Sequence, residues 1–496
     1  MVDVFWGIGG MIALLAIALL FSVDRRRIRI RTVALALALQ VTFGVLVLYV
    51  PAGRAVLETV TRAVQAVINS SAAGIDFLFG PVLPEEGGVF AFQVLPVIVF
   101  FAALTSVLYY LGVLQWVVKI IGGGLAKLLG TTTPESMNAA ANIFVGQTEA
   151  PLVIRPYVAK MTRSELFAVM CGGLATVAGS VLVGYSLLGA PLEYLIAASF
   201  MAAPAALLMA KILVPTGAME APAAAPAGDP GVAGSPASTD RGTGDPVRDE
   251  PAREEARGAR RWLAGGARRG ATSHAALEIA RRQDAQTADR NDGDAVRPDD
   301  VARSADPEGV SATDAAGDPA DEDEAPANVI DAAARGASDG LSLALNVGAM
   351  LIAFISLIAL ANVILGSIGG LFGMGDLTLE QLFGYVFAPV MFAVGVPWAE
   401  ALDAGSFLGQ KLVLNEFVAF ADFAPQIDTY SAKTQAIVTF ALTGFANFGS
   451  LAILLGGLGG IAPSRRRDIA QLGLRAVLGG TLANLMSAAI AGMLIG

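Results

Sequence analysis

Residues 131–160 read TTTPESMNAAANIFVGQTEAPLVIRPYVAK, and this stretch decides the fold. It is apolar in parts, but proline, glycine, asparagine, glutamine and glutamate interrupt it before it reaches the roughly 20 residues that span a bilayer. A backbone at membrane depth leaves its helix only where it is buried in protein or lines a cavity. The pattern therefore predicts a re-entrant hairpin, which enters the membrane and returns to the same side.

Long apolar runs flank this stretch and predict an all-α polytopic membrane protein. Of the 496 residues, 55% are hydrophobic and 15% are charged, and the mean hydropathy is +0.62. Soluble domains carry about 25% charged residues, so this composition excludes most of them. Eight runs are long enough to span a bilayer: 4–23, 33–50, 89–114, 166–188, 192–214, 341–365, 436–458 and 469–495.

A second interrupted stretch, residues 387–420, predicts another re-entrant hairpin. Three predicted crossings separate the two hairpins, so the first enters from the cytoplasm and the second from outside. Their orientations are therefore expected to be opposite.

An internal repeat supports this pairing of hairpins. The first hairpin carries GQTE at 146–149, and a span containing Gly-Ser at 179–180 follows about thirty residues later. The second carries Gly-Gln at 409–410 and Glu416, and Gly-Ser at 449–450 follows at a similar distance. Two units of opposite orientation, each with a hairpin and an interrupted helix, are typical of secondary transporters with a binding site at the bilayer midplane.

Arginines set the expected topology. The cluster RRRIRIR at 25–31 follows the first apolar run, whereas a secretory signal carries its positive charge before that run. Because basic loops stay in the cytoplasm, the N-terminus is expected outside. With this orientation the basic loops at 155–163 and 465–467 both lie on the cytoplasmic side, in agreement with the same rule. The expected location is the plasma membrane, here the inner, cytoplasmic membrane of a prokaryote.

The acidic net charge belongs to one segment. The chain has 33 Lys+Arg and 43 Asp+Glu, a formal net charge of -10, and residues 216–327 hold 13 Arg, no Lys and 23 of the acids. The membrane body is therefore neutral. The segment has little to build a core, so a disordered cytoplasmic insertion is expected. A solvated linker is favoured. In the alternative, the Arg-rich block 248–282, with Trp262 and Leu263, rests on the anionic leaflet.

The sequence has one cysteine and one histidine, and their positions exclude several classes of function. The only cysteine, Cys171, allows no intramolecular disulfide. The only histidine, His274, lies in the insertion, which excludes a His/Cys metal site and a His-based triad in the spans. An intramembrane hydrolase lacks its nucleophile and base. No catalytic residue, no enzyme activity and no organic cofactor are expected.

Two carboxylates at membrane depth, Glu149 and Glu416, are candidate functional residues. An ionisable side chain there costs several kcal/mol unless it is hydrated or paired. Two alternatives stay open: Glu149 forms a salt bridge with Arg155 or sits at a lipid-facing end, and Glu416 pairs with Lys411 about one helical turn away. Their matching places in the two repeats favour a functional role.

Two spans have sequences that favour a helix break, GLATVAGSVLVG at 173–184 and GFANFGSLAILLGGLGG at 444–460. Close helix packing through small residues is the alternative. It is weaker for the second span, because Asn447 has two donors and two acceptors that need partners in a dry environment.

Three sequence motifs resemble those of the concentrative nucleoside transporters. GQTEAPLVIRPY (146–157), GQKLVLNEFVAF (409–420) and GFANFGS (444–450) are similar to the three signature motifs of that family. The flanking runs SFMAAPAALLMAKI and NVIDAAARGAS are also similar. The resemblance covers nearly the whole chain except 216–327, and it implies a cation-coupled nucleoside symporter.

The resemblance implies a nucleoside site between the hairpins and the interrupted helices. Gln147, Thr148 and Glu149 would face the base, and Val181 would line the pocket. Glu416, Asn447 and Ser450 would hold the ribose hydroxyls, and Phe445 would pack beside the nucleoside. Amides and carboxylates suit these contacts, because they match the polar edges of a base and the hydroxyls of a sugar.

The resemblance also implies a sodium site at Asn142, Val145, Thr176 and Val177. Side-chain oxygens and backbone carbonyls freed by unwinding suit a hard monovalent cation. The sequence departs from the family at Thr176, Thr443 and Phe420, where Ser, Cys and Tyr are common. The first change keeps an oxygen ligand, and the other two are candidates for a shift in substrate preference.

By the same resemblance the protein is expected to be a homotrimer that works by alternating access. Five parts are expected: scaffold spans one to three; an interfacial helix, the first hairpin and spans four and five; the insertion; scaffold span six; and the second hairpin with spans seven and eight. Their boundaries are 1–115, 116–215, 216–327, 328–370 and 371–496. Proton coupling, another polar substrate such as a nucleobase, and an ion channel remain alternatives.

Overall fold

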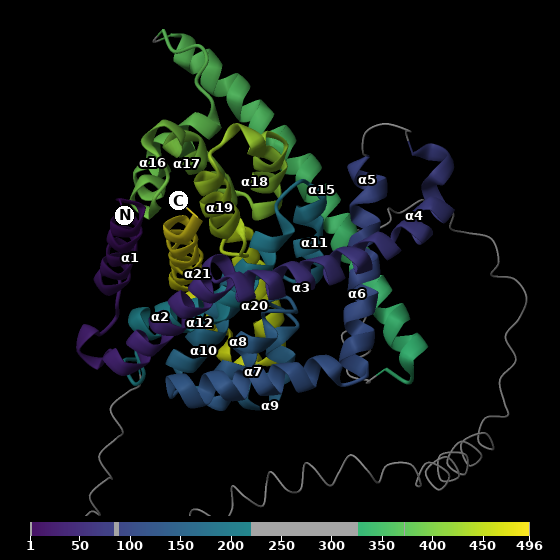
Figure 1. Cartoon of the computed structure of the whole chain (residues 1–496), viewed down its shortest axis with the longest axis vertical. Helices are drawn as coiled ribbons and strands as arrows, with labels where there is room; N and C mark the ends of the chain where they lie inside the picture. Colours follow the sequence, from purple (N-terminus) through teal and green to yellow (C-terminus); the bar gives the residue numbers. More distant parts are fainter. Residues whose placement is uncertain (1, 84–88, 220–325, 372, 496) are drawn as a thin grey trace, which may run out of the picture. The chain divides into compact units, whose positions relative to one another are not determined.

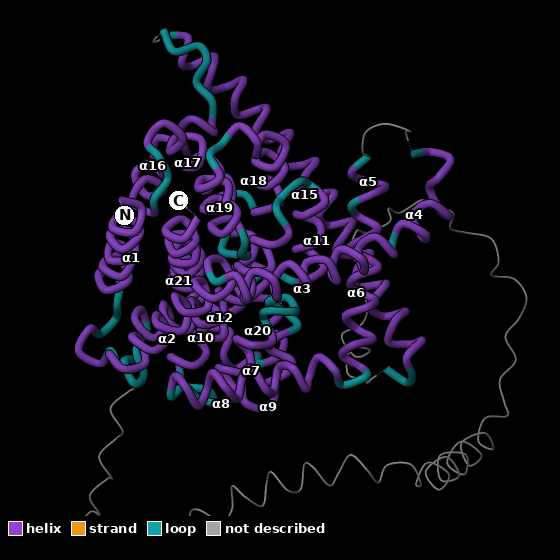
Figure 2. The backbone as a smooth tube through the Cα atoms, in the orientation of Figure 1, coloured by secondary structure: helices purple, strands orange, loops and turns teal. Residues whose placement is uncertain are grey.

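The computed structural model describes residues 2–83, 89–219, 326–371 and 373–495, which form helices joined by turns (Figure 2). Residues 220–325 lie outside the described part of the chain. The expected disorder of the insertion and the proposed contact of Trp262 and Leu263 with the leaflet fall there.

The helices of the first half, labelled in Figure 1, include those of the first five predicted spans and further helices between them. They are α1 (Val2–Leu20), α2 (Ile30–Gly44) with a π-helical end (Val45–Tyr49), α3 (Pro51–Ser70), α4 (Ala72–Phe79), α5 (Phe90–Gln93), α6 (Leu95–Tyr110), α7 (Val113–Leu129), α8 (Thr133–Ala141), a 3₁₀ segment (Ala150–Ile154), α9 (Arg155–Val158), α10 (Arg163–Ala175), α11 (Gly179–Leu187) and α12 (Leu192–Leu213).

The second half continues the same pattern of long and broken helices (Figure 1). It contains α15 (Val329–Gly370), α16 (Leu379–Val394), α17 (Trp398–Val413), α18 (Glu416–Phe423) with a 3₁₀ end (Ala424–Thr429), α19 (Ala432–Leu442), α20 (Phe448–Ile461) and α21 (Arg466–Ile495).

Seven of the eight predicted spans are helices long and apolar enough to cross a membrane in the described part of the chain. They are Asp3–Leu20, Ile30–Tyr49, Phe90–Tyr110, Arg163–Leu187, Leu192–Leu213, Val329–Gly370 and Pro463–Ile495. The sixth is much longer than predicted, because the Asn328 side chain accepts from the Asp331 amide and starts the helix well before the apolar run. Its 42 residues extend about 63 Å, twice the hydrocarbon thickness.

The seventh predicted span, residues 436–458, is two shorter helices, α19 and α20, with a break between them. The predicted second hairpin lies where α16 and α17 meet at an angle of 116° and where the chain breaks again between α17 and α18. The predicted first hairpin is α8, an irregular turn and the 3₁₀ segment packed back against α8. Both interrupted stretches of the sequence are therefore broken helices.

The spans fall into two classes by burial. Arg163–Leu187, Leu192–Leu213 and Pro463–Ile495 are largely buried in the protein, whereas the other four expose most of their surface. The C-terminal helix α21 is central, because α1, α10, α12 and α19 all pack on it (Figure 1). The exposed spans are the four that the sequence analysis expected to form the scaffold.

Two exposed spans, α6 and α15, pack along each other through glycine. A Cβ added to Gly340 would lie 2.7 Å from the Cβ of Ala102 and 2.8 Å from the Cα of Val99. Only glycine allows this approach, so helix packing through small residues applies here.

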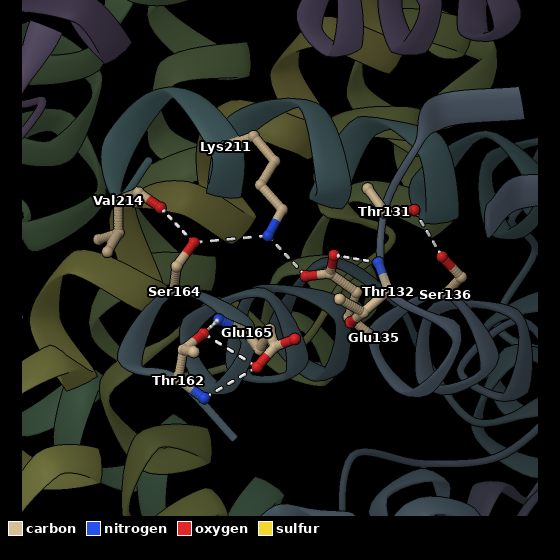
Figure 3. Close-up of polar contacts among 9 residues, drawn as sticks. All are labelled: Thr131, Thr132, Glu135, Ser136, Thr162, Ser164, Glu165, Lys211 and Val214. Atoms are coloured by element: carbon tan, nitrogen blue, oxygen red, sulfur yellow. Dashed lines mark hydrogen bonds and ion pairs between the residues drawn. The ribbon is translucent and has the colours of Figure 1, made fainter. Parts of the chain in front are cut away.

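A buried ion pair ties the base of the first hairpin to the buried helices (Figure 3). Lys211, near the end of α12, lies 2.6 Å from Oε2 of Glu135 on α8, and both side chains are buried. The other oxygen of Glu135 accepts from the amide of Thr132 at 2.8 Å, which completes a capping box at the start of α8. Ser164, at the start of α10, lies 3.4 Å from the Lys211 nitrogen. Three elements of the core are therefore held at one point.

We expect Lys211→Met to destabilise the protein by about 3–5 kcal/mol, because it leaves the buried Glu135 carboxylate without its partner. Thermal unfolding of the purified protein in detergent measures the loss. The double variant Glu135→Gln with Lys211→Met should recover most of it, since neither buried charge remains. Equal unfolding temperatures for wild type and Lys211→Met would show that the pair contributes nothing.

Candidate functional site

The first interrupted helix breaks at residues 176–178, between α10 and α11. Thr176 caps α10 with an extended backbone, and its hydroxyl donates to the carbonyl of Gly172 at 2.8 Å. The tip of the first hairpin lies against this break, because the amide of Gly179 donates to the carbonyl of Phe144 at 3.1 Å. The expected break at the Gly-Ser pair is therefore present, with Gly179 as the first residue of α11.

The second interrupted helix breaks at residues 443–447, between α19 and α20. Asn447 begins α20, because its side-chain oxygen accepts from the amide of Ser450 at 2.7 Å. The two breaks touch, since the amide of Phe445 donates to the carbonyl of Thr176 at 3.1 Å. Two segments far apart in the sequence thus form one irregular region.

The second hairpin places Glu416 at the start of α18, after the break that follows α17. The side chain is buried, and both oxygens are bonded. Oε1 accepts from the Tyr185 hydroxyl at 2.9 Å, and Oε2 accepts from the Asn447 amide at 2.8 Å. Residues from α11, α18 and the second break therefore fix the direction of this carboxylate.

The first hairpin holds its own carboxylate differently. Oε2 of Glu149 accepts from the amide of Gly146 at 2.8 Å and closes the tip of the turn. Glu149 keeps exposed surface although its carboxyl lies deep in the protein, whereas Glu416 is 4% exposed. The two carboxylates occupy matching places in the repeat but are not equivalent.

A cavity of about 150 Å³ lies between these elements. All eight residues of the predicted nucleoside site line it: Gln147, Thr148, Glu149, Val181, Glu416, Phe445, Asn447 and Ser450. The side-chain oxygen of Gln147 is buried and has no hydrogen-bond partner in the described protein, which leaves an acceptor for a ligand. The structure thus brings the eight together, and their binding of a nucleoside stays a prediction.

One wall of the cavity is formed by residues that the sequence motifs do not indicate. Leu343, Val347 and Met350 of α15 also line it, together with Phe417 and Ile453. The α15 residues have helical spacing, but every face of this helix is apolar, so the sequence alone did not show which face meets the cavity.

The four residues of the predicted sodium site lie at the tip of the first hairpin and in the first break, two segments that the bond from Gly179 to Phe144 joins. Asn142, Val145, Thr176 and Val177 are all buried. The amide nitrogen of Asn142 donates to the carbonyl of Asn138 at 3.0 Å, so its oxygen points away and has no partner among the described residues. The hydroxyl of Thr176 donates its hydrogen to Gly172 and keeps its lone pairs. This set of neutral oxygens fits a monovalent cation.

The suggested pair between Glu416 and Lys411 is not a direct salt bridge in the described residues, although the two groups interact electrostatically. The ammonium of Lys411 donates to the carbonyl of Ala441 at 2.7 Å and to the oxygen of Asn484 at 2.8 Å. The sequence analysis gave no role to Asn484 or Tyr185, because a polar residue in an apolar run does not reveal its partner.

Two departures from the family pattern lie behind the cavity lining. The ring of Phe420 stacks on Tyr185 with the centroids 4.5 Å apart, and the hydroxyl of Thr443 donates to the carbonyl of Thr439 at 2.6 Å. Neither residue lines the cavity. Any effect on substrate preference would therefore pass through Tyr185 or the helix break.

Three family models match the chain. Residues 9–82 match the Na+ dependent nucleoside transporter N-terminus, residues 91–192 match the model described as nucleoside recognition, and residues 296–492 match the Na+ dependent nucleoside transporter C-terminus. Together they include the residues of both hairpins and both helix breaks.

Whole proteins also match over nearly their full length. A protein of Bacillus subtilis described as the uncharacterized transporter YutK is 48% identical over 99% of this chain and 100% of its own. The nucleoside permease NupC of Helicobacter pylori is 40% identical over 98% of this chain and 97% of its own. A solved structure of CNTnw in an inward-facing substrate-bound state is 45% identical, covers 99% of this chain and 98% of its own, and has a TM-score of 0.76.

Proposed function

The chain belongs to the concentrative, Na+ dependent nucleoside transporter family, and from this membership we propose that it imports nucleosides by symport with sodium ions. It is a multi-pass membrane transporter and not an enzyme. The observation that carries the proposal is the single cavity lined by all eight predicted nucleoside-binding residues.

The cavity has two chemical sides, which suit the two parts of a nucleoside. On one side Gln147, Thr148 and Glu149 offer amide, hydroxyl and carboxylate groups to the polar edge of a base. On the other side Glu416 accepts hydrogen bonds from ribose hydroxyls, supported by Asn447. A buried site of this kind rejects analogues that lack the hydroxyls, because its polar groups would stay unpaired.

The cation belongs at the first break, beside the nucleoside cavity. The oxygen of Asn142, the hydroxyl of Thr176 and the carbonyls of Val145 and Val177 would surround it. Sodium is transported with the substrate and would stabilise the conformation in which the first hairpin and the break lie together. Since Gln147 follows Val145 closely on the same tip, each ligand would raise the affinity for the other.

We also propose how the protein assembles and in which membrane it lies. The four exposed spans would form the scaffold of a homotrimer, and the buried helices with both hairpins would move against it to give alternating access. The protein would lie in the cytoplasmic membrane with its N-terminus outside and residues 216–327 inside, following its basic loops.

Uptake of labelled uridine into proteoliposomes under an inward sodium gradient tests the function. We expect accumulation above the external concentration, since the gradient drives transport against the substrate gradient. Potassium and proton gradients of equal size are the controls. Absence of accumulation under every gradient would overturn nucleoside symport, whereas accumulation with the proton gradient alone would replace only the cation.

A further inference from the structure

Lys411 is a fully buried lysine that the transport site does not use directly. It lies in the last turn of α17 and has no exposed surface. Its nitrogen donates to the carbonyl of Ala441 and to the side-chain oxygen of Asn484. Among the described residues, no carboxylate lies within 4.0 Å of this nitrogen. Its hydrogen-bond partners are therefore neutral oxygens, the kind of ligand that a bound alkali cation takes, and Glu416 interacts with it electrostatically without a direct contact.

The oxygens around Lys411 belong to the second helix break. α19 ends at Leu442, so its last carbonyls have no donor within the helix. The Lys411 nitrogen donates to the carbonyl of Ala441, and the side-chain nitrogen of Asn484 donates to the carbonyl of Thr443 at 2.8 Å. Two buried side chains thus provide donors that the break itself lacks.

Asn484, on the central helix α21, joins this break to the first one. Its amide nitrogen also donates to the carbonyl of Ala175, the last residue of α10, at 2.7 Å. The direction of the amide is set by Lys411, since a flipped amide would turn its NH₂ group toward the ammonium and its oxygen toward two carbonyls. The space is closed, because a Cβ on Gly444 would lie 2.3 Å from the Asn484 oxygen.

The two breaks are equivalent parts of the internal repeat. The interval from Glu149 to Thr176 equals the interval from Glu416 to Thr443. Both threonines cap the broken helix and donate to the carbonyl four residues earlier, at 2.8 Å and 2.6 Å. The polar residues before the two carboxylates are not at matching positions, because Asn142 directly follows α8, seven residues before Glu149, whereas Lys411 lies in the last turn of α17, five residues before Glu416.

The residue that each hairpin contributes differs in one respect. Asn142 contributes a buried oxygen without a partner, which suits a cation from solution. Lys411 contributes a cation that is part of the chain, and it is already held by a carbonyl of the break and an amide oxygen. The first break thus has a buried oxygen without a partner, and the second has a lysine nitrogen bonded to two oxygens.

We propose that Lys411 is a tethered cation that serves the second repeat as the sodium ion serves the first. Its ammonium holds the Ala441 carbonyl, orients Asn484 and so fixes both breaks around the nucleoside cavity. Lys411 is a positioning residue, because it reaches the cavity only through Asn484 and the second break. The comparison with sodium rests on the proposed function, whereas the role of the ammonium does not.

Lys411→Met removes the charge and keeps most of the side-chain volume. We expect nucleoside exchange across proteoliposomes to fall about 30-fold or more, because two buried acceptors lose their donor. The matched control is Lys433→Met on α19, which removes a lysine paired with the partly exposed Asp3 and should keep exchange within about twofold. Exchange by Lys411→Met at the level of this control would overturn the proposal.

Lys411→Ala tests whether the second break depends on the positive charge of Lys411 or only on the bulk of its side chain. It leaves a space beside the Ala441 carbonyl and the Asn484 oxygen, where a free sodium ion has ligands. We measure labelled uridine binding in detergent across a sodium titration with choline as the replacement. The slope of log affinity against log sodium counts the linked ions, and we expect it to rise by about one relative to wild type. An unchanged slope would overturn the cation role.

These experiments distinguish a failure of the proposed sodium symport from a failure of the proposed role of Lys411. Exchange needs no gradient, so Lys411→Met is informative even where wild-type uptake is driven by protons. The titration compares the slope of the variant with the slope of wild type. A wild-type slope of zero would remove sodium from the first break. A rise of about one in Lys411→Ala would still support the tethered cation.

Discussion

Glu416→Gln is expected to abolish nucleoside uptake while the protein still folds. The carboxylate is buried in the cavity wall, where Tyr185 and Asn447 donate to its two oxygens and aim it. A neutral amide cannot accept charge-assisted hydrogen bonds from ribose hydroxyls at both atoms. Each such bond is worth about 1.5–3 kcal/mol, so the loss of two predicts a fall of roughly 100-fold or more.

The measurement is initial uridine uptake in proteoliposomes, with thermal unfolding in detergent as the test of folding. Glu193→Gln is the matched control, because it makes the same change at an exposed position at the start of α12. That variant should transport like wild type. Uptake by Glu416→Gln near the level of this control would remove Glu416 from the nucleoside site.

Asn142→Ala is expected to remove the response of nucleoside affinity to sodium. The buried oxygen of Asn142 has no partner in the described protein and is the side-chain ligand that the first hairpin contributes. Coupling between two ligands is usually 5–150-fold, so wild type should bind uridine roughly tenfold more tightly in sodium than in choline. The variant should show about the same affinity in both.

Asn138→Ala provides the control for this prediction. It truncates another buried asparagine, one turn earlier on α8, whose nitrogen donates to the carbonyl of Val169 and whose oxygen also has no partner among the described residues. The comparison therefore separates the position of Asn142 at the hairpin tip from the mere presence of a buried oxygen without a partner. It should lose some thermal stability and keep the sodium response. A sodium response retained by Asn142→Ala would exclude this asparagine as a ligand, whatever the control shows.

The broken helices were the most predictable part of the structure. Pro134, Gly146 and Glu149 interrupt one apolar stretch, and the second stretch carries similar interruptions, so helix breaks at membrane depth followed from composition. The boundaries were less certain. The sequence analysis began the sixth span twelve residues too late, because a capped helix continues through polar turns outside the membrane.

The polar partners inside the membrane were not predictable in the same way. The spacing of Lys411 and Glu416 allows a salt bridge, but the Lys411 nitrogen donates to Ala441 and Asn484 instead. The difference of burial between Glu149 and Glu416 was also invisible, because the repeat makes them look equivalent. Local spacing sets which side of a helix a residue lies on, and distant segments decide what it meets there.

The sequence by itself determined that this chain is an all-helical membrane protein with two interrupted stretches, and its motifs gave the family. Apolar length and helix-breaking residues act locally, so they can be read from one segment. Only the tertiary structure decided that eight residues from both repeats line one cavity, and that Asn484 joins the carbonyls of two breaks. Those arrangements depend on hydrogen bonds between segments hundreds of residues apart, because a broken helix exposes polar groups that only another part of the chain can satisfy.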